Sequence, residues 1–539
     1  MIRTVDQSKC VGCGTCQKVC PLDVFRLETR QLAVSPCKYA CPIQNDMREM
    51  HYLLQMGRVD DAARMMLQSN PLASVTGRIC PAFCESECTR AQVDSAVNIS
   101  AIEQYLGDYL LEEKVEPMLR RHVAPIAVVG SGPASLTCAY FLAADGFRVT
   151  MFEAKNEPGG MLRYAIPEFR LPGRVTASLI ERLQGMGVTI QCGMALNDAF
   201  TIDGLRAQGF GAVFLGVGAG RAKKIEMEGI DAEGIYPGLE FLEGVRMGSI
   251  SSMKQRVAVV GGGDVAMDVA QTARRLGAES VTVIALEDDT TLPAYRRNID
   301  AAKAERIEIL CSRGIDKILQ KGGRVKGLRL VRCTSVFDQQ GVFAPAYDRA
   351  DCSDVPVDLV ILAVGQEPDI SSLPEDLVSA KRLIKADLET TQTSLPYVFG
   401  AGDAIRGSTS VAHAIAGGKR AAQAIMFYLK GMELEWLPPL AMPVTGALPE
   451  KAQIPRAKRH ERVLAAQGPN PFQEKYTGLD LVQMLAEADR CMTCGAKSVA
   501  AHLDDCMTCF ACELGCPSEA IFVHPFKEIL PRSLRPIGP

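Results

Sequence analysis

Two stretches of the chain join a short run of apolar residues to a glycine-rich turn and a longer mixed segment. Residues 124–154 read APIAVVGSGPASLTCAYFLAADGFRVTMFEA, and residues 256–286 read RVAVVGGGDVAMDVAQTARRLGAESVTVIAL. In each stretch the first apolar run predicts a strand, the segment after the glycines predicts a helix, and a second apolar run predicts another strand. The pattern predicts an α/β chain with two Rossmann-like nucleotide-binding domains.

The pattern differs on either side of these units. Residues 51–67, HYLLQMGRVDDAARMML, have apolar residues at helical spacing, which predicts a helical domain over 35–122. Residues 436–458, WLPPLAMPVTGALPEKAQIPRAK, are rich in proline and predict an extended linker on the surface. No apolar run approaches the ~20 residues that span a bilayer.

Composition and charge exclude several classes of protein. The chain has 539 residues, of which 47% are hydrophobic and 23% charged, so three or four globular domains are expected. A net charge of −4 and a single Trp give no support for a nucleic-acid partner. The start, MIRTVDQSKC, lacks the apolar core of a secretory signal, so we expect a cytoplasmic protein without a membrane partner.

The chain contains 20 cysteines, most of them clustered. Two runs, KCVGCGTCQKVCP and DCMTCFACELGCP, have the spacing of bacterial ferredoxins, in which three thiolates on a tight loop hold one [4Fe-4S] cluster. A zinc site or free thiols are the alternative. The cysteines of the two runs are Cys10, Cys13, Cys16 and Cys20, and Cys506, Cys509, Cys512 and Cys516.

In two-cluster ferredoxins the fourth cysteine of each run ligates the other cluster. We therefore expect both ends of the chain to form one ferredoxin-like module, although two separate one-cluster lobes are the alternative. In the crossed arrangement, one cluster takes Cys10, Cys13, Cys16 and Cys516, and the other takes Cys506, Cys509, Cys512 and Cys20.

A further seven cysteines lie in three motifs, which are SPCKYACPI (Cys37 and Cys41), GRICPAFCESEC (Cys80, Cys84 and Cys88) and RCMTCG (Cys491 and Cys494). With the nucleotide-binding units, these motifs resemble the small subunit of glutamate synthase and the related module of dihydropyrimidine dehydrogenase, over roughly residues 37–495. In that family the R-C-x-x-C-G element lies just before C-x-x-x-C-P, whereas here it stands near the far end of the chain.

The resemblance implies a set of ligands, provided that the fold brings the two ends together. Cys491 and Cys494 would then join Cys84 and Cys88 on one cluster. Cys37, Cys41 and Cys80 would hold a second cluster, with Glu103 as the fourth ligand and Gln104 as the neighbouring option. Because a carboxylate is a hard ligand for iron beside thiolates, a solvated helix position is the alternative for Glu103.

Fifteen cysteines and Glu103 would supply four ligands to each of four [4Fe-4S] clusters. The remaining five cysteines lie in apolar or strand-like settings, where a free thiol behaves as a small buried hydrophobe. These five are Cys138, Cys192, Cys311, Cys333 and Cys352.

The glycine-rich turns have the features of dinucleotide sites. Gly130 permits the tight turn, Gly132 lets the backbone approach a pyrophosphate, and the helix that follows offers its N-terminus to that group. Glu153 ends the second strand, where an acid binds a ribose diol. The helix begins at Pro133 and Ala134, and the matching residues of the second unit are Gly261, Gly263, Asp264 and Val265.

Three segments resemble the FAD side of the glutamate synthase family, namely EPGGMLRYAIPEFRLP (with Gly160), YVFGAGDAI (with Gly402 and Asp403) and SVAHAIAGGKRAA (with Ala414). The resemblance implies that Asp403 binds the ribityl chain and that the next helix points its N-terminus at the flavin pyrimidine. The first fold would therefore bind FAD, and the inserted second fold would bind the nicotinamide coenzyme. The flavin domain lacks a redox C-x-x-C, so no disulfide relay is expected.

The residue after the second strand of the inserted fold bears on the coenzyme. Family members that use NADPH carry two arginines there, whereas this chain has Leu286 and Glu287. A carboxylate at Glu287 accepts hydrogen bonds from the ribose 2′-OH and repels a 2′-phosphate, so we expect NAD rather than NADP. Arg296 and Arg297 lie nearby and leave NADP open, and an exposed loop is the alternative for Glu287.

The expected domains are a ferredoxin-like half (1–34), a helical iron–sulfur domain (35–122), an FAD domain (123–240 and 367–432), an inserted NAD domain (241–366), a linker (433–475), a returning cysteine segment (476–500) and a second ferredoxin-like half (501–539). We expect no catalytic side chain, because the flavin carries the hydride.

The expected function is an electron-transfer subunit that couples NAD(H) through FAD and four clusters to a larger redox subunit or ferredoxin, in a hetero-oligomer. A 2-oxoacid:acceptor oxidoreductase such as phenylglyoxylate dehydrogenase is the favoured complex. The alternatives are a glutamate synthase small subunit, a free-standing NAD(P)H:ferredoxin oxidoreductase and, in another class, a scaffold for cluster assembly.

Overall fold

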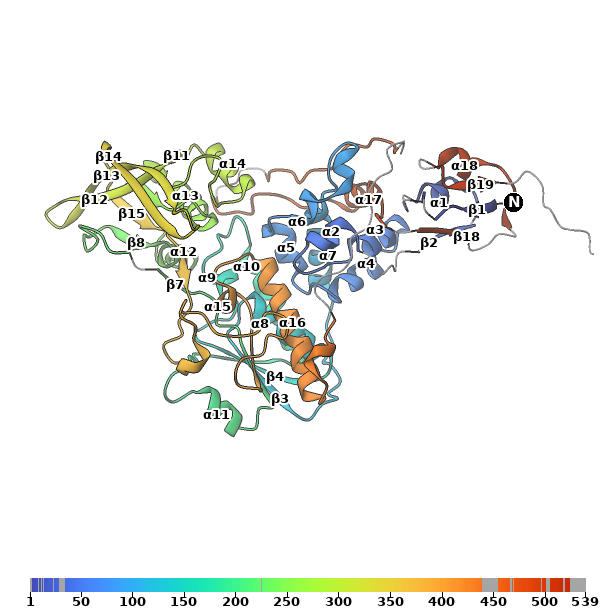
Figure 1. Ribbon diagram of the computed structural model, residues 1–539, viewed down its shortest axis with the longest axis horizontal. Helices are drawn as coiled ribbons and strands as arrows, with labels where there is room; N and C mark the ends of the chain where they lie inside the picture. Colours follow the sequence, from blue (N-terminus) through green and yellow to red (C-terminus); the bar gives the residue numbers. More distant parts are fainter. Residues whose placement is uncertain are drawn as a thin grey trace, which may run out of the picture. The chain divides into compact units, whose positions relative to one another are not determined.

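The computed structural model describes residues 2–7, 9–10, 12, 14–22, 24–28, 34–223, 225–438, 454–465, 468, 470–495, 497–500, 505–516 and 519–523 (Figure 1). The chain forms two units. Unit 1 comprises Met1–Leu110, Pro438–Val463 and Gly478–Pro539, and unit 2 comprises Leu111–Leu437 and Leu464–Thr477. Segments from both ends of the chain therefore share unit 1.

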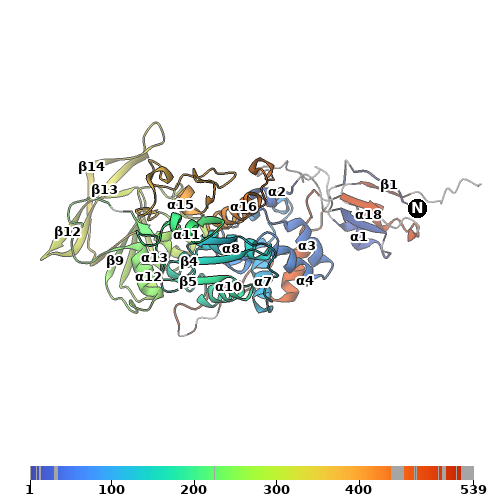
Figure 2. The same ribbon diagram turned by 90° about the horizontal axis from the view of Figure 1, so that it is seen from below.

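The first glycine-rich stretch contributes two strands, β3 (Pro125–Val129) and β4 (Arg148–Glu153), to a parallel five-stranded sheet in unit 2. The strand order of this sheet is β17 (Val398–Gly400), β6 (Ala212–Leu215), β3, β4 and β5 (Thr189–Cys192). Helices α8 (Pro133–Ala144) and α16 (Val411–Leu429) lie side by side (Figures 1 and 2). The apolar run of β3 is buried, as a strand between two others in a covered parallel sheet requires. The shorter helices of this part are α9 (Met161–Tyr164), α10 (Gly173–Gly185), α11 (Ile202–Ala207) and α15 (Asp403–Arg406).

The second stretch forms another parallel five-stranded sheet. Its order is β11 (Glu308–Leu310), β10 (Ser280–Ile284), β9 (Arg256–Val260), β15 (Leu359–Leu362) and β8 (Ile235–Pro237), with helices α12 (Gly238–Arg246), α13 (Asp264–Arg275) and α14 (Arg296–Ala304). Between β11 and β15 in the sequence, the chain forms a separate antiparallel sheet of β12 (Arg313–Lys321), β13 (Arg324–Phe337) and β14 (Phe343–Val355). Strands β7 (Arg221–Ala222) and β16 (Gln366–Glu367) pair where the chain enters and leaves this part. The predicted α/β class, with one nucleotide-binding domain inserted in another, is confirmed.

Unit 1 contains a helical part whose core includes residues from near the C-terminus. Its helices are α2 (Pro36–Ala40), α3 (Met47–Gln55), α4 (Val59–Leu67), α5 (Ala73–Ile79), α6 (Phe83–Ser86), η1 (Thr89–Gln92), α7 (Ile99–Glu112) and α17 (Leu481–Asp489). Met484 and Ala488 of α17 are fully buried among the other helices. The helical stretch at 51–67 is two helices, because Gly57 adopts φ +72° and ends the first.

Two glycines let α5 and α7 cross at backbone contact. A Cβ atom on Gly107 would lie 2.1 Å from the backbone nitrogen of Ser74, and one on Gly77 would lie 2.4 Å from that of Gln104. No residue larger than glycine fits at either position without moving a helix. This crossing brings Glu103 of α7 against α5.

The two ends of the chain build the remainder of unit 1 together. Strand β1 (Ile2–Val5) pairs antiparallel with β19 (Ile521–Val523), and β2 (Phe25–Glu28) pairs antiparallel with β18 (Lys497–Ala500). Helices α1 (Thr15–Val19) and α18 (Ala511–Gly515) lie side by side in both views (Figures 1 and 2). The prediction that the ends fold into one ferredoxin-like module is confirmed. None of the helices in the described ranges has both the length and the apolar composition of a membrane span.

Candidate functional site

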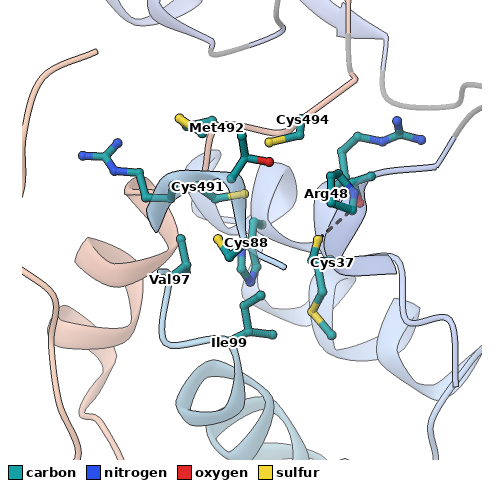
Figure 3. A pocket seen from close by; sticks show the side chains of 14 residues that line it. Cys37, Arg48, Cys88, Val97, Ile99, Cys491, Met492 and Cys494 are labelled. Carbon is teal, nitrogen blue, oxygen red and sulfur yellow. Dashed lines mark hydrogen bonds between the residues drawn. The ribbon is translucent and has the colours of Figure 1, made fainter. Parts of the chain in front are cut away.

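Four cysteines from three segments of unit 1 line one cavity, where their sulfur atoms face a common space (Figure 3). Cys37 lies on α2, Cys88 follows α6, and Cys491 and Cys494 follow α17. We call these four residues the first cysteine group. Burial, followed by the negative charges of Cys494 and Cys88, raises the pKa of Cys37 to about 12, although the hydroxyl of Ser35 opposes the shift. Such thiols become thiolates only when a cation binds them.

A second group consists of Cys41, Cys80, Cys84 and Glu103. Burial, followed by the negative charges of Cys41 and the carboxylates of Glu85 and Glu103, raises the pKa of Cys84 well above its ordinary value. The charge of Cys80 adds to this shift. Burial likewise raises the pKa of Cys41, and the charge of Glu103 adds to that shift. The electrostatic coupling indicates that the four acidic groups lie close together.

The partition between the two groups differs from the prediction for one pair of residues. We predicted Cys84 in one group with Cys88, Cys491 and Cys494, but Cys37 takes that place around the cavity. The reason is the placement of the cysteines on two short helices. Cys37 lies near the start of α2 and Cys41 just after its end, and Cys84 and Cys88 flank α6 in the same way. Each helix therefore supplies one thiol to each group.

Glu103 is buried, with 5% of its surface exposed, so the alternative of a solvated helix position is wrong. Its Oε1 accepts hydrogen bonds from Asn45 Nδ2 (2.8 Å) and Asn70 Nδ2 (2.7 Å). Burial raises the pKa of Glu103 to about 7 against these bonds. Gln104 points elsewhere, because its Oε1 accepts a bond from Arg462. Glu103 is therefore the better placed of the two candidates.

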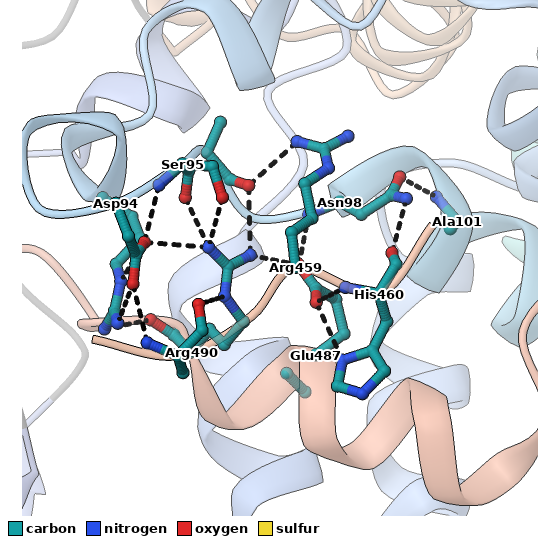
Figure 4. Close-up of polar contacts among 12 residues, drawn as sticks. Asp94, Ser95, Asn98, Ala101, Arg459, His460, Glu487 and Arg490 are labelled. Atoms are coloured by element: carbon teal, nitrogen blue, oxygen red, sulfur yellow. Dashed lines mark hydrogen bonds and ion pairs between the residues drawn. The ribbon is translucent and has the colours of Figure 1, made fainter. Parts of the chain in front are cut away.

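A buried polar network holds the start of the R-C-x-x-C-G segment (Figure 4). The Arg490 guanidinium is 1% exposed and pairs with Glu487 (2.6 Å) and Asp94 (2.9 Å). It also donates to the carbonyl oxygens of Ser95 (2.6 Å) and Ala96 (3.1 Å). These bonds fix Arg490, and with it the neighbouring Cys491, to the loop that follows Cys88.

Glu487 lies at the centre of the same network. Besides Arg490, its carboxylate accepts bonds from the backbone N–H groups of Asn98 (2.7 Å) and His460 (2.7 Å) (Figure 4). Arg90 donates to the carbonyl oxygen of Pro455 (2.7 Å). Residues 454–463, which belong to the predicted linker, thus form part of the scaffold around the first cysteine group.

The predicted crossed arrangement of the ferredoxin-like module has support at its C-terminal run. Cys20 of the first run lines a cavity with Cys506, Cys509 and Cys512, as the prediction requires. Burial raises the pKa of Cys512 to about 11, and the charge of Cys20 adds to this shift. We call these four residues the third cysteine group.

The N-terminal run is anchored by β18. The backbone N–H of Ser498 donates to Cys10 Sγ (3.2 Å), and its hydroxyl lies 3.1 Å from Cys16 Sγ. Cys16 is buried and shares an apolar core with the partly buried Cys516. Cys10 and Cys16 form the described part of a fourth group, for which Cys516 remains the predicted fourth ligand and whose expected member Cys13 lies outside the described residues.

Several contacts join the helical part of unit 1 to the ferredoxin-like module, among them the Lys18–Asp489 ion pair (2.8 Å), and one of them lies between two cluster-binding loops. The hydroxyl of Thr493, between Cys491 and Cys494, donates to the carbonyl oxygen of Gly12, between Cys10 and Cys13. Thr493 adopts φ 46°, which a β-branched residue rarely does, and such backbone strain is concentrated at functional sites. The loops of the first and fourth groups therefore touch.

In the described residues, no three His, Cys, Asp or Glu side chains are arranged to hold a single metal ion. A [4Fe-4S] cluster differs from a single ion because its ligands surround a larger inorganic core.

The five cysteines outside the four groups differ in their exposure to solvent. Cys138 and Cys333 are buried and Cys311 is partly buried, but Cys192 and Cys352 are exposed, so the expectation of burial is wrong for those two.

The residues predicted to bind FAD meet at one place in unit 2. Gly130 has φ +95°, and a Cβ there would lie 2.4 Å from the carbonyl oxygen of Gly216. A Cβ on Gly160 would lie 2.8 Å from Gly132 Cα, so the EPGG loop covers the turn. Gly402 approaches Ala134 and Ala414, each of which lies in the first turn of a helix. The Cβ position of Gly132 faces open space, as a backbone cradle for a pyrophosphate requires.

The two acids of this site are placed differently. Glu153 is buried, and its carboxylate accepts bonds from the hydroxyl of Ser131 in the turn and from the backbone N–H of Lys155 (2.8 Å). Asp403 accepts bonds from the backbone N–H (3.1 Å) and hydroxyl (2.8 Å) of Thr409, while burial raises its pKa. Ser135, in the usual place of a third glycine, donates to the carbonyl oxygen of Gly216 (3.3 Å).

The inserted fold repeats this geometry. A Cβ on Gly261 would lie 2.4 Å from the carbonyl oxygen of Ala363, and the Cβ position of Gly263 faces open space. The Glu287 carboxylate reaches the turn, since its Oε2 is 2.9 Å from where a Cβ on Gly262 would lie. Asp264 accepts bonds from the backbone N–H of Tyr295 and the Asn298 amide, so its carboxylate holds α14. Val265 packs against the core of this fold.

Several residues of these sites escaped prediction from the sequence. Gly216 and Ala363 follow β6 and β15 and meet the glycine-rich turns only because the sheets are parallel. Ser498 and Thr493 contact the N-terminal run across more than 480 positions of sequence separation, as two of their bonds span 488 and 481 residues. No local spacing signals such contacts.

Three family models match the chain. Pyridine nucleotide-disulphide oxidoreductase matches residues 124–418, dihydropyrimidine dehydrogenase domain II with a 4Fe-4S cluster matches residues 30–115, and the 4Fe-4S binding domain matches residues 3–26. Among solved structures, the chain resembles FprA, an oxidoreductase of Mycobacterium tuberculosis, with a TM-score of 0.50, 17% identity and coverage of 57% of this chain and 85% of FprA. That likeness concerns the fold.

The chain is also similar to characterised proteins over most of its length. It is 31% identical to the NADP(+)-dependent formate dehydrogenase subunit beta of Moorella thermoacetica, covering 87% of this chain and 71% of the relative. It is 32% identical to the NAD-dependent dihydropyrimidine dehydrogenase subunit PreT of Escherichia coli (74% and 92%), and 33% identical to the glutamate synthase [NADPH] small chain of Escherichia coli (73% and 88%). The chain therefore belongs to the pyridine nucleotide-disulphide oxidoreductase family, and it is an electron-transferring FAD, NAD(P) and iron–sulfur oxidoreductase related to the glutamate synthase small subunit.

Proposed function

We propose that this protein is an electron-transfer subunit that couples NAD(H) through FAD and four [4Fe-4S] clusters to a partner redox subunit. When bound, FAD exchanges a hydride with nicotinamide and single electrons with iron–sulfur clusters. The chain's own residues would bind and orient these groups and keep water from them. The contact between Thr493 and Gly12 carries the proposal, because it joins the cluster loops of the family domain to those of the added ferredoxin-like module.

Each cluster would take four ligands. The first group would hold one cluster and the second group would hold another, with Glu103 as the single carboxylate ligand. The third group would hold a cluster through thiols from both runs. The fourth group, completed by Cys13 and Cys516, would hold the cluster between the first and third groups. Electrons would then pass along unit 1 from the first group through the fourth group to the third group, and from there toward the partner.

The position of Glu287 supports NAD as the coenzyme. Its carboxylate lies over the glycine-rich turn, where it would accept hydrogen bonds from both hydroxyls of a ribose and oppose a 2′-phosphate. Arg296 pairs with Asp300 (3.0 Å) on the same helix, which occupies it away from a phosphate. The named relatives use either coenzyme, so the proposal rests on this chain's residues.

The partner would be the catalytic subunit of a 2-oxoacid:acceptor oxidoreductase, because the added module suits a donor that passes single electrons through clusters. A glutamate synthase small subunit is the second candidate, favoured by the similarity to that small chain. A free-standing NAD(P)H:ferredoxin oxidoreductase shares the same chemistry without a tight partner.

The test uses the purified full chain under anaerobic conditions. Addition of NADH should bleach the flavin absorbance, and a low-potential donor such as reduced ferredoxin should drive reduction of NAD. Purification from the native host should recover a 2-oxoacid-oxidising subunit with the chain. A chain that binds flavin but exchanges no electrons with either nicotinamide would contradict the proposal, and co-purification with an amidotransferase subunit would favour the second candidate.

A further inference from the structure

His51 lies in the wall of the cavity that the first cysteine group lines. It is on α3 with 1% of its surface exposed, and neither Nδ1 nor Nε2 has a hydrogen-bond partner in the described part of the chain. A buried polar group left without a partner destabilises the fold. Native structures rarely accept this destabilisation, so two unpartnered ring nitrogens beside four thiols indicate that a bound group completes the site.

We propose that His51 donates an N–H hydrogen bond to the iron–sulfur cluster held by Cys37, Cys88, Cys491 and Cys494, and thereby raises its reduction potential. The inference rests on the proposed function, since it requires that cluster. The acceptor is a thiolate or inorganic sulfur, and reduction adds negative charge to both. A hydrogen bond to sulfur is therefore stronger in the reduced state and favours electron uptake.

The surroundings of the ring favour a neutral donor. Burial lowers the pKa of His51 to about 4, against the charge of Glu487, so one ring nitrogen carries hydrogen at neutral pH and the other does not. Positive charge at this cavity comes instead from Arg48 and Arg90, which line it and are buried. His51 is thus suited to position a dipole against the cluster and not a full charge.

Other polar groups of the wall already face the thiols. The Ser35 hydroxyl lies 3.2 Å from Cys37 Sγ. Burial raises the pKa of Cys494, and a hydrogen bond with Thr89 opposes that shift. The lining also includes the apolar side chains of Met47, Val97 and Ile99, which offer no acceptor, and the guanidinium groups of Arg48 and Arg90, which only donate. Because the hydroxyls of Ser35 and Thr89 already engage thiols, the sulfur atoms of the four cysteines and of their cluster are the acceptors that remain for the His51 N–H.

The test is a redox titration of the iron-loaded protein, monitored by electron paramagnetic resonance. His51→Leu should lower the midpoint potential of one cluster, with about a tenfold fall in its reduced-to-oxidised ratio at fixed potential, which is 59 mV for one electron. His51→Gln keeps an N–H donor and should shift less. Met47→Leu changes the same wall without removing a donor and should leave all potentials unchanged. Equal potentials in wild type and fully loaded His51→Leu would overturn the role of His51.

A second measurement does not depend on the folding of a leucine variant. Wild-type protein labelled with ¹⁵N-histidine should show nitrogen coupling to a reduced cluster in pulsed electron paramagnetic resonance, and His51→Gln should lose it. Absence of coupling in the wild type would overturn the inference. Iron and sulfide analysis separates two failures. A protein in which the first cysteine group binds no iron contradicts the proposed function, whereas a loaded cluster without coupling contradicts only the role of His51.

Discussion

At the scale of single residues, the environment of Glu103 decides what the sequence left open. The family resemblance pointed to this position, but a carboxylate among thiols is an uncommon ligand. Burial and the two asparagine donors distinguish it from a solvated glutamate and from Gln104. Those donors come from the loops that precede α3 and α5, so no inspection of α7 alone would reveal them.

The raised pKa of Glu103 predicts a dependence of stability on pH in the iron-free protein. Its carboxyl has a pKa of about 7 in the fold and an ordinary value of 4.5, so the folded chain holds the proton more tightly than the unfolded chain. This contribution to stability is complete below pH 4.5 and is lost as the pH rises to 7, by up to about 3 kcal/mol. Glu103→Gln should remove the loss.

Urea unfolding of iron-free protein at pH 5 and pH 8 measures this effect. Glu112→Gln, at the exposed end of the same helix, is the matched control and should behave as wild type. If wild type and Glu103→Gln lose equal stability between the two pH values, the carboxyl is not buried as described.

Glu287 predicts the choice of coenzyme. Glu287→Gln removes the negative charge that would oppose a 2′-phosphate, so kcat/KM with NADPH should rise relative to NADH by about tenfold or more, corresponding to about 1.4 kcal/mol. Asp289→Asn, which removes a carboxylate paired with Lys303 on the surface, is the control. A wild-type preference for NADPH would contradict the assignment.

At the scale of elements, the sequence predicted both nucleotide-binding units, because apolar strands and glycine-rich turns are local signals. It did not predict the break at Gly57 or the exchange of Cys37 and Cys84. Both depend on how short helices are oriented, and spacing does not specify orientation. The segment 454–463 appeared as a linker because its role lies in backbone hydrogen bonds that a proline-rich composition does not suggest.

The buried network around α17 predicts a stability difference between two neighbouring acids. Glu487→Gln breaks a fully buried ion pair with Arg490 and should cost about 3 kcal/mol in the unfolding of unit 1. Asp489→Asn breaks an ion pair with Lys18 that is about half exposed, and should cost less than about 1 kcal/mol. Urea unfolding of both variants makes the comparison, and equal costs would show that the network does not anchor Cys491.

The crossing of α5 and α7 predicts a second difference. Gly107→Ala places a methyl group 2.1 Å from a backbone nitrogen of α5 and should force the helices apart, which lowers stability by about 1–3 kcal/mol and displaces Glu103. Gly185→Ala, on α10, meets its nearest atom at 3.5 Å and should be neutral or stabilising by up to about 1 kcal/mol. Thermal unfolding and iron content report both effects, and an unchanged Gly107→Ala would contradict the close crossing.

At the scale of the whole molecule, the pairing of β1 with β19 and of β2 with β18 joins the two ends of the chain. The ferredoxin spacing of the two runs was a local signal. We expected the runs to meet because in two-cluster ferredoxins the fourth cysteine of each run ligates the cluster of the other run. The contact of Thr493 with Gly12 was not foreseeable, because it depends on the return of the R-C-x-x-C-G segment to the helical part.

The most direct test of the shared ligands is a crystallographic map of iron, recorded at the iron absorption edge from anaerobic crystals of the full chain. We expect four iron centres, with one bonded to Cys20, Cys506, Cys509 and Cys512, and another bonded to Cys37, Cys88, Cys491 and Cys494. A map in which Cys20 shares an iron centre with Cys10, or in which Cys491 and Cys494 bind no iron, would contradict it.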